Sequence, residues 1–599
     1  MSTGTNIQGG AFLLGGVDPR RVFVPEMLSD EDRLIGKTAA DFLRLEALSK
    51  VDAIEAGDHA LMADLMRKAG ALGLLGADVP EVYGGLGLKM TTSALIAEKL
   101  NPQQSFALTH EAHTVIATLP LLYFGNHDQK SRYLPRLASG EWIGSFALSE
   151  ANAGSDALAM QTRATLSTDG AHYLLRGEKM WITNTAFADL FTVFAKVDGE
   201  KVTVFLVERN SPGLSFGKEE HKLGMHGTST RRVILEDVAV PVENALEVGK
   251  GHYAAFCALN LGRFKLEAGA VGGLKSLLST CAIYAKQRKT FGRPIAEYGL
   301  IKHKLAEMCA RTFALESMVY RLAYDLDTAF DGIVPEADDA PTNYHRAAEE
   351  LTIECSIVKV IGSEAYSLFA DEAIQIHGGY GYTEEFPVAR AWRDQRLLRI
   401  GEGANEIVRL AIVNTLLRRD LAGRLSALDA GRKVSAALMQ SEVPNPDLYD
   451  DPIDALGGLT RDVTDAALFT LYQASEQLGP ALLEQQEIAA AVADLVCMSY
   501  CLQSVTLRCK SLRSAPPPRF DAMLLAAETV GQWAGEEAHR AIRYILDSLP
   551  GLDEIVDWRD EPFTGIRNLL DRLIQRDSSP AELRRKLADA VIAQEGYPF

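Results

Sequence analysis

Long apolar runs are missing from this 599-residue sequence. No stretch reaches about 18 uninterrupted apolar residues, the length that a membrane-spanning helix needs. The first residues, Met1 to Gly16, are rich in glycine and lack the basic start of a secretory leader, and Arg20 and Arg21 alone do not make a transit sequence. Cysteine is scarce, and seven scattered thiols are typical of a reducing compartment. We therefore expect a cytoplasmic protein.

Positive charge is also in short supply. Lys and Arg number 61 against 80 Asp and Glu, which gives a net charge of −19. A strongly acidic chain repels phosphate groups, so nucleic acid is excluded as a general partner and membrane association is doubtful. Cys497 and Cys501 share a helix face without a second ligand pair, so we interpret them as packing thiols and predict no metal site.

Changes in hydrophobic period divide the chain and indicate an α+β fold that is mainly α. Ser29 begins a region where apolar residues recur at every third and fourth position, as on a helix. Near Trp142 the segments become short and β-branched, with turn signals between them, which predicts a β-domain. Helical periods return after Gly251, and a Pro-rich acidic stretch at Ser441 to Pro452 precedes further helices. We expect an N-terminal arm (1–28), a helical domain (29–143), a β-domain (144–250) and a helical bundle (251–424). A linker (425–452) and an additional helical domain (453–599) follow.

A patch of small residues, Ala268 to Gly273, lies within the first helical segment after Gly251. Because no strand precedes it, it does not fit a nucleotide-binding loop. The pattern indicates close packing of helices at this point.

One carboxylate stands out in the second helical region. Glu402 lies between Gly401 and Gly403, just before the apolar-periodic run Ile407 to Leu417. Flanking glycines let the backbone turn sharply and approach a ligand. Two interpretations are a solvated loop acid and a general base delivered into a closed site. Positive charge comes from an upstream run, Arg390, Arg393, Arg396 and Arg399.

Four other motifs accompany the Glu402 loop in order: Phe146 to Asp156, Lys179 to Thr183, Gln287 to Gly292, and Gln375 to Tyr382. Together these five resemble the signatures of the acyl-CoA dehydrogenases. The length and the extra C-terminal region are similar to the very-long-chain branch. The resemblance implies a middle β-barrel domain, a C-terminal four-helix bundle and the cofactor FAD.

Residue types at the motifs suit a flavin dinucleotide. Trp181 offers an aromatic wall and Thr183 a hydroxyl on the same strand face, while Arg288 and Thr290 suit a pyrophosphate. Core packing for Trp181 and a solvated helix end for Arg288 are the alternatives. The resemblance implies that Gly378 and its neighbours act on the cofactor of a second subunit, and hence a homodimer. The residues that it assigns to FAD are Phe146, Leu148, Ser149, Ser155, Trp181, Ile182, Thr183, Arg288, Thr290, Phe291, Gln375, Gly378, Gly379, Ala404 and Glu406.

The resemblance also assigns the substrate contacts and the base. Glu402 would be the catalytic residue, and the CoA thioester would contact Ser155, Asn260, Arg263 and Gly403. A capping serine and a surface arginine are the alternatives for these sites. Ala404 replaces the usual Thr or Ser, so one hydroxyl contact to the cofactor is missing. Gly401 replaces a frequent Tyr or Phe, which leaves room for a long or bulky acyl chain.

We therefore expect FAD-dependent dehydrogenation of a long-chain acyl-CoA to trans-2-enoyl-CoA in fatty-acid β-oxidation, with electrons passed to an electron-transfer flavoprotein. Two alternatives share the fold: an acyl-CoA oxidase that uses oxygen, and a non-catalytic assembly or DNA-associated scaffold. The acidic tail argues against DNA, and an intact Glu402 argues against a purely structural role. In 425–452 the adjacent cations Arg432 and Lys433 are followed by acids, so we expect no firm membrane attachment and a tail that packs on its own core.

Overall fold

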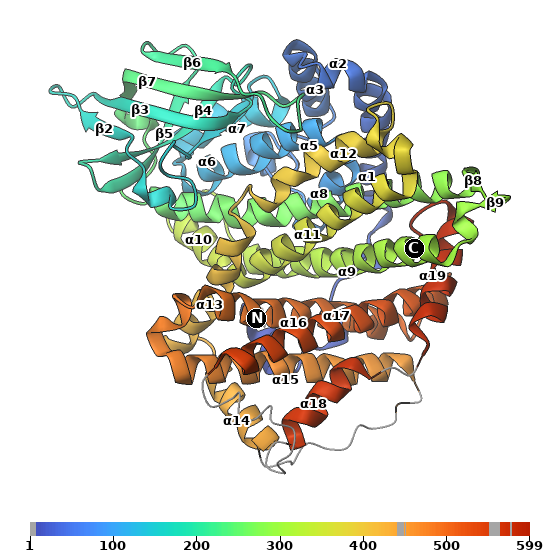
Figure 1. Cartoon of the computed structure of the whole chain (residues 1–599). Coiled ribbons are helices and arrows are strands. Elements are labelled where there is room, and N and C mark those ends of the chain that lie inside the picture. Colours follow the sequence, from blue (N-terminus) through green and yellow to red (C-terminus); the bar gives the residue numbers. More distant parts are fainter. Residues whose placement is uncertain (1–6, 440–448, 450, 550–563, 576–577) are drawn as a thin grey trace.

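The computed structural model describes residues 7–439, 449, 451–549, 564–575 and 578–599. Helix formation begins where the sequence predicts it, because the Ser29 hydroxyl accepts from the Asp32 amide and the Asp32 carboxylate closes a capping box. The N-terminal helical region lies at the top of Figure 1, beside the sheet. Its helices are α1 (Asp30–Phe42), α2 (Val51–Glu55), α3 (His59–Ala71), α4 (Met90–Leu100), α5 (Gln104–Glu111), the π-helix η7 (Ala112–Ala117), α6 (Leu119–Phe124) and α7 (His127–Ser139).

The predicted β-domain is confirmed as a curled, seven-stranded sheet (Figure 1). Strand β4 is buried along nearly its whole length, which fits its position between neighbours. The order is β1-β4-β2-β3-β7-β6, with β5 also pairing with β4; β1 and β2 run parallel to β4, and the other pairs are antiparallel. The strands are β1 (Gly144–Ala147), β2 (Arg163–Leu166), β3 (His172–Thr183), β4 (Leu190–Val197), β5 (Lys201–Glu208), β6 (Leu214–Glu219) and β7 (Thr230–Pro241).

Long helices below the sheet and the N-terminal helices form the predicted bundle (Figure 1). The small-residue patch lies where they approach most closely: a Cβ at Gly272 would overlap the Glu98 carbonyl of α4, and one at Gly273 would overlap the Tyr366 hydroxyl of α11. The interpretation as a packing patch is confirmed. The elements are α8 (Gly251–Gln287), the short strands β8 (Lys289–Thr290) and β9 (Arg293–Pro294), α9 (Gly299–Phe330), α10 (Ala340–Glu350), α11 (Thr352–His377), η11 (Gly378–Tyr382), α12 (Pro387–Gln395), η12 (Arg396–Arg399) and α13 (Asn405–Leu421).

Additional helices form a further layer under the bundle, at the bottom of Figure 1. By length and composition α16 is the one helix in the described part of the chain that could cross a membrane, yet 83% of its apolar window is buried inside the protein. Packing against neighbouring helices therefore accounts for its apolar side chains. The elements are α14 (Ala427–Met439), α15 (Pro452–Leu478), α16 (Gln486–Leu512), α17 (Phe520–Ser548), α18 (Thr564–Ile574) and α19 (Pro580–Gln594).

The predicted linker 425–452 is only partly described. Its first part is the helix α14, which packs closely on α15, because a Cβ at Gly431 would overlap the Leu468 carbonyl. Both cations that the sequence singled out, Arg432 and Lys433, pair with Asp429 of the same helix. Residues 440–448 and 450 lie outside the described residues, and the domain limits stay a prediction.

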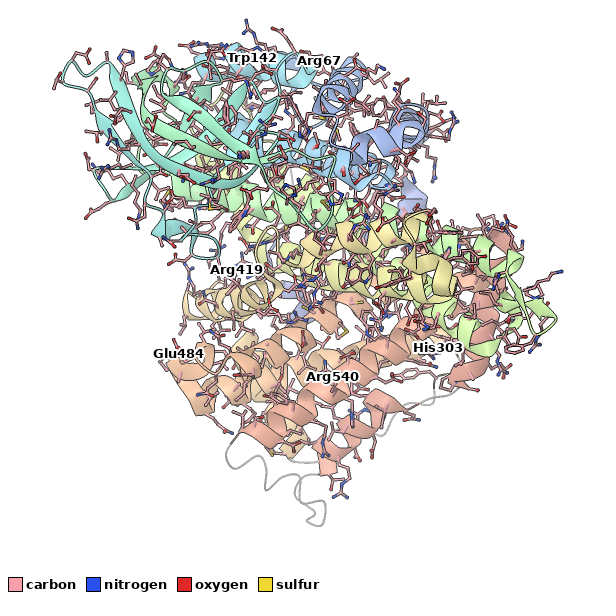
Figure 2. The ribbon with its side chains drawn as sticks, turned by 45° about the horizontal axis from the view of Figure 1, so that its top comes forward. Arg67, Trp142, His303, Arg419, Glu484 and Arg540 are labelled. Atoms are coloured by element: carbon pink, nitrogen blue, oxygen red, sulfur yellow. The ribbon has the colours of Figure 1, made fainter. Side chains whose placement is uncertain are left out.

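Buried charges join the bundle, the N-terminal arm and the additional helices. Arg508 of α16 is 1% exposed and donates to Glu316 of α9 at 2.8 Å and to Glu26 of the arm. The Tyr597 hydroxyl donates to the same Glu316 carboxylate at 2.6 Å, which returns the C-terminus to the bundle. Within the bundle, buried Arg419 of α13 donates to the Glu349 carbonyl of α10 at 2.7 Å (Figure 2). The additional helices are therefore an integral layer of the fold.

Candidate active site at the Glu402 loop

The five residues between η12 and α13, Ile400 to Ala404, carry the predicted base on a sharp turn. Glu402 has φ 55°, in the left-handed region that glutamate rarely adopts, and Gly403 follows with φ 100°. Such a conformation costs free energy and persists only where surrounding contacts hold it, which is frequent at functional sites. The loop is therefore a backbone feature that the structure maintains against local preference.

Two cations, the half-buried Arg263 and the buried Lys359, hold the backbone of this loop. Arg263 of α8 donates from Nε to the Glu402 carbonyl at 2.9 Å. Lys359 of α11 donates to the Gly403 carbonyl and, at 2.6 Å, to Oδ1 of Asn405, the first residue of α13. Charge-assisted hydrogen bonds from two different helices fix the position of the turn.

The Glu402 side chain is half-buried, and one oxygen of its carboxyl group points to α8. Its Oε2 atom is buried and accepts no hydrogen bond from any described residue. A Cβ at Gly262 would lie only 2.9 Å from this atom, so the glycine lets the carboxyl approach the helix. Burial raises the pKa of Glu402 to about 7, while the nearby charges of Arg263 and Lys359 lower it. A carboxyl group with such a pKa can exchange a proton near neutral pH.

The predicted substrate residues fall into two kinds. Ser155 is exposed in the loop after β1, and its hydroxyl has no partner among the described residues. Asn260 and Arg263 are bonded within the protein instead. Arg263 donates to the Glu402 carbonyl and to Asn260, and Asn260 donates to Thr352 at 2.8 Å. These observed contacts indicate positioning of the loop; contact of either residue with a substrate stays a prediction.

One group of predicted cofactor residues lies where β1 ends beside β3. The Met180 amide donates to the Ser149 carbonyl at 2.9 Å, and a register shift in β3 places Trp181 at φ 58° with its side chain 56% exposed. Thr183 is half-buried on the same side, with no described partner for its hydroxyl. The side chains of Phe146, Leu148 and Ile182 are buried, so these residues could reach a ligand only through their backbones.

A second group surrounds the short β8–β9 hairpin at the right edge of Figure 1, away from the sheet. The guanidinium of Arg288 forms no hydrogen bond or ion pair with a described residue and lies over the Tyr380 ring at 5.6 Å. Phe291, at the turn, is 93% exposed. Gln375 is exposed at the end of α11, where Gly378 and Gly379 begin η11. This surface offers an uncommitted cation and exposed rings.

Ala404 and Glu406 lie beside Glu402, at the start of α13. Ala404 is half-buried and Glu406 is exposed. Within one chain the predicted cofactor residues thus form separate groups: one at β1 and β3 of the sheet, one at the β8–β9 hairpin, which lies away from the sheet in Figure 1, and one at the start of α13. That division is what a cofactor shared between two subunits would require.

The arginine-rich run gathers on the outer face of α11. Arg396 and Arg399 line an open concavity of about 480 Å³ together with Glu364, Leu368 and Trp392. The Nη1 atom of Arg396 and the Nε atom of Arg399 are buried and have no partner among the described residues. Two arginines of the run therefore line the concavity, where Glu364 and Asp371 supply negative charge as well, and Glu402 is not among the lining residues.

Sequence reasoning missed Lys359 and Gly262. Lys359 is a single cation within the apolar run Ile353 to Ile361, which is a signal of a buried partner. Gly262 has no such signal, because a single glycine within a helical pattern resembles ordinary helix packing. Its role depends on the carboxyl group of a residue far away in the chain.

Comparisons with known proteins agree with this geometry. Models of the acyl-CoA dehydrogenase N-terminal, middle and C-terminal domains match residues 29–141, 145–238 and 249–417. A probable acyl-CoA dehydrogenase of Bacillus subtilis (strain 168) is 43% identical over 502 residues, 84% of this chain and 84% of that protein. The mitochondrial very long-chain specific acyl-CoA dehydrogenase of Homo sapiens is 35% identical over 438 residues, 70% of this chain and 62% of the human protein. The crystal structure of an acyl-CoA dehydrogenase complexed with FAD from Bacillus anthracis has TM-score 0.94 and 39% identity, over 99% of this chain and 100% of that chain.

Proposed function

From the premise that this chain belongs to the acyl-CoA dehydrogenase family, we propose that Glu402 removes the α-proton of an acyl-CoA thioester. Hydride leaves the β-carbon in the same reaction, which gives the trans-2-enoyl-CoA. The protein is an oxidoreductase. The observation that carries the assignment is the Glu402 carboxyl group, whose Oε2 atom is buried, has no partner among the described residues and is held against α8 by a strained loop.

The cofactor is FAD, which the similar Bacillus anthracis structure contains. The residues present fit it, because Arg288 has an uncommitted guanidinium for phosphate, and Trp181 and Phe291 expose large rings. We assign Thr183 and Ser149 to the ring system and Arg288, Thr290 and Gly378 to a second subunit's cofactor, in a homodimer. When bound, FAD accepts the hydride.

The loop supplies more than a base. The Glu402 amide donates to no described acceptor, so it is available to a thioester carbonyl oxygen. A donor placed there stabilises the negative charge that develops as the α-proton leaves. Burial raises the pKa of Glu402 to about 7, which brings the base closer to the acidity of the proton that it must take.

We also propose a long-chain substrate, a role in fatty-acid β-oxidation and an electron-transfer flavoprotein as the electron acceptor. Gly401 supports a long or bulky acyl group, since a Cβ there would meet only Leu397, at 3.6 Å and beyond.

The test is anaerobic titration of the FAD-loaded protein with saturated CoA esters of increasing chain length, with loss of the flavin absorbance as the readout. Absence of bleaching by every ester would overturn the function. Rapid reoxidation by oxygen would favour an oxidase over a dehydrogenase, and light scattering measures the oligomeric state.

Replacing Arg288 with alanine should weaken FAD binding by about 2–3 kcal/mol, the order expected for losing a charge-assisted contact. The thermal midpoint should fall and recover when FAD is added, because a ligand that binds only the folded state stabilises it by mass action. Arg293→Ala is the matched control on the same hairpin, since that side chain already lies over the Tyr298 ring at 4.1 Å. Equal FAD affinity in the Arg288 variant and the parent would show Arg288 to be a surface charge only.

The pH dependence of flavin reduction should follow Glu402. The deprotonated carboxylate is the active form, so the rate should rise with pH through about 7. The Lys359 charge lowers the pKa of Glu402, so Lys359→Met should move the rising part of the pH–rate profile to higher pH by about one unit. The maximal rate at high pH should also fall, because the loop loses the Lys359 contact to the Gly403 carbonyl. Lys130→Met is the control, a buried lysine bonded to the Pro335 carbonyl at 2.9 Å. If the rising part of the pH profile lies at the same pH in the Lys359 variant as in the parent, the Lys359 charge does not influence the pKa of the base.

A further inference from the structure

A small polar cavity lies along the seam between α8 and the N-terminal helices, close to the Glu402 carboxyl. At Gly262 this seam is formed by Glu402 and by Ile116 of η7, whose Cγ2 is 3.4 Å from a Cβ built there. Three residues further along α8, Lys265 lines the cavity together with Val115, the neighbour of Ile116. Three residues of α8 rise about 4.5 Å, so the cavity begins about one helical turn along α8 from the Glu402 carboxyl, and an acyl chain directed along this seam would reach it.

Two of the residues that line the cavity, His110 and Glu111, carry buried polar atoms without a partner among the described residues. His110 is 6% exposed and Glu111 is 9% exposed. Nδ1 of His110 and Oε1 of Glu111 are buried and have no hydrogen-bond partner among the described residues. Covering such atoms with hydrocarbon leaves them unsatisfied, which costs about 1–3 kcal/mol for each.

The charges in the cavity are already balanced. Lys265 pairs with both oxygens of Asp78, at 3.0 and 3.1 Å, and also bonds to Ser93. Burial raises the pKa of Glu111 to about 8 and lowers the pKa of His110 to about 4, so both are neutral at pH 7. A charged guest would therefore find no free counter-ion.

The donor and acceptor roles that remain match one chemical group. His110 Nε2 lies 3.0 Å from the Leu74 carbonyl and donates to it, which leaves Nδ1 as an acceptor. A protonated Glu111 can donate or accept. A hydroxyl group also does both, and the cavity leaves about 10 Å³ for the centre of a water-sized group, which is room for one hydroxyl.

We propose that this cavity is a specificity subsite for a hydroxyl group on the acyl chain of the substrate, bound by His110 and Glu111. The inference rests on the proposed function and deepens it. It predicts that saturated hydrocarbon chains are the poorer substrates once they are long enough to reach the cavity.

The experiment uses the FAD-loaded protein and long-chain acyl-CoA esters that carry one hydroxyl, moved along the chain one carbon at a time. For one position, kcat/KM for flavin reduction should exceed that of the saturated ester by at least about tenfold, which corresponds to one hydrogen bond of about 1.4 kcal/mol. Glu111→Met should abolish that ratio, and Glu111→Gln should keep part of it. Glu267→Met is the matched control, because Glu267 is also a buried glutamate, on α8, but faces Gly362 of α11.

Binding of the same esters to Glu402→Gln protein is the second readout. The hydroxylated ester should bind at least about tenfold more tightly than the saturated one. If no hydroxyl position is preferred in either readout, the cavity holds only a water and the proposal is overturned. The same follows if the preference survives Glu111→Met. Loss of bleaching with every ester would instead count against the proposed function, while the binding ratio still decides the subsite.

Discussion

Replacing Glu402 with glutamine should lower the rate of flavin reduction by acyl-CoA at least about a thousandfold, because the amide cannot accept the α-proton. The amide has nearly the same shape, and the contacts that hold the loop do not use the Glu402 side chain: Arg263 binds the Glu402 carbonyl, and Lys359 binds the Gly403 carbonyl. The variant should therefore stay folded and yellow and should still bind substrate. Stopped-flow measurement of flavin bleaching under anaerobic conditions gives the rate.

Glu406→Gln is the matched control for this experiment. Glu406 is the next carboxylate along the chain, but it is exposed on the first turn of α13, so its replacement should leave the chemical step close to the parental rate. A Glu402→Gln protein that bleaches as fast as the parent would show that the base lies elsewhere. A large loss in the Glu406 variant would point to that residue.

Arg508→Met should destabilise the fold by about 3–5 kcal/mol, the cost expected when one partner of a buried ion pair is removed. Arg508 is 1% exposed, and its loss leaves the carboxylates of Glu316 and Glu26 without their shared cation. Lys275 remains beside Glu316, but Glu26 has no other ion-pair partner among the described residues. The free energy of unfolding in urea measures the effect, and added FAD should not fully restore it.

Arg540→Met supplies the comparison, since Arg540 makes an exposed pair with Glu537 on α17 (Figure 2). Surface pairs of this kind contribute about 0–1 kcal/mol. Combining Arg508→Met with Glu26→Gln should cost less than the sum of the two single changes, because the second change removes the carboxylate that the first leaves unpaired. If Arg508→Met costs no more than the surface control, the buried network does not hold the layers together.

Local patterns in the sequence were sufficient for the order and type of the main elements. Ser29 and Asp32 form the capping box of α1 through contacts within a single turn. The change from helical to strand period near Trp142 reflects only how neighbouring side chains alternate between core and solvent. The small residues from Ala268 to Gly273 predicted close packing because nothing larger fits between adjacent helices.

The sequence also singled out Glu402, since two flanking glycines and the following apolar run are visible over a few residues. The motifs around Trp181 and Arg288 supported a dinucleotide cofactor for the same reason. What those motifs could not give is the exposure of each side chain. The bulge that exposes Trp181 depends on the register between β3 and β7.

By itself, then, the sequence determined the mainly helical fold class, the family motifs and the identity of the predicted base, because each depends on residues that are close along the chain. Only the tertiary structure decided what surrounds that base. Arg263 reaches the Glu402 carbonyl across 139 residues, and Lys359 reaches Gly403 across 44. Burial, which raises the pKa of Glu402 to about 7, comes from the meeting of α8 and the loop. No local pattern encodes which helix faces meet, since that is set by how all the cores pack together.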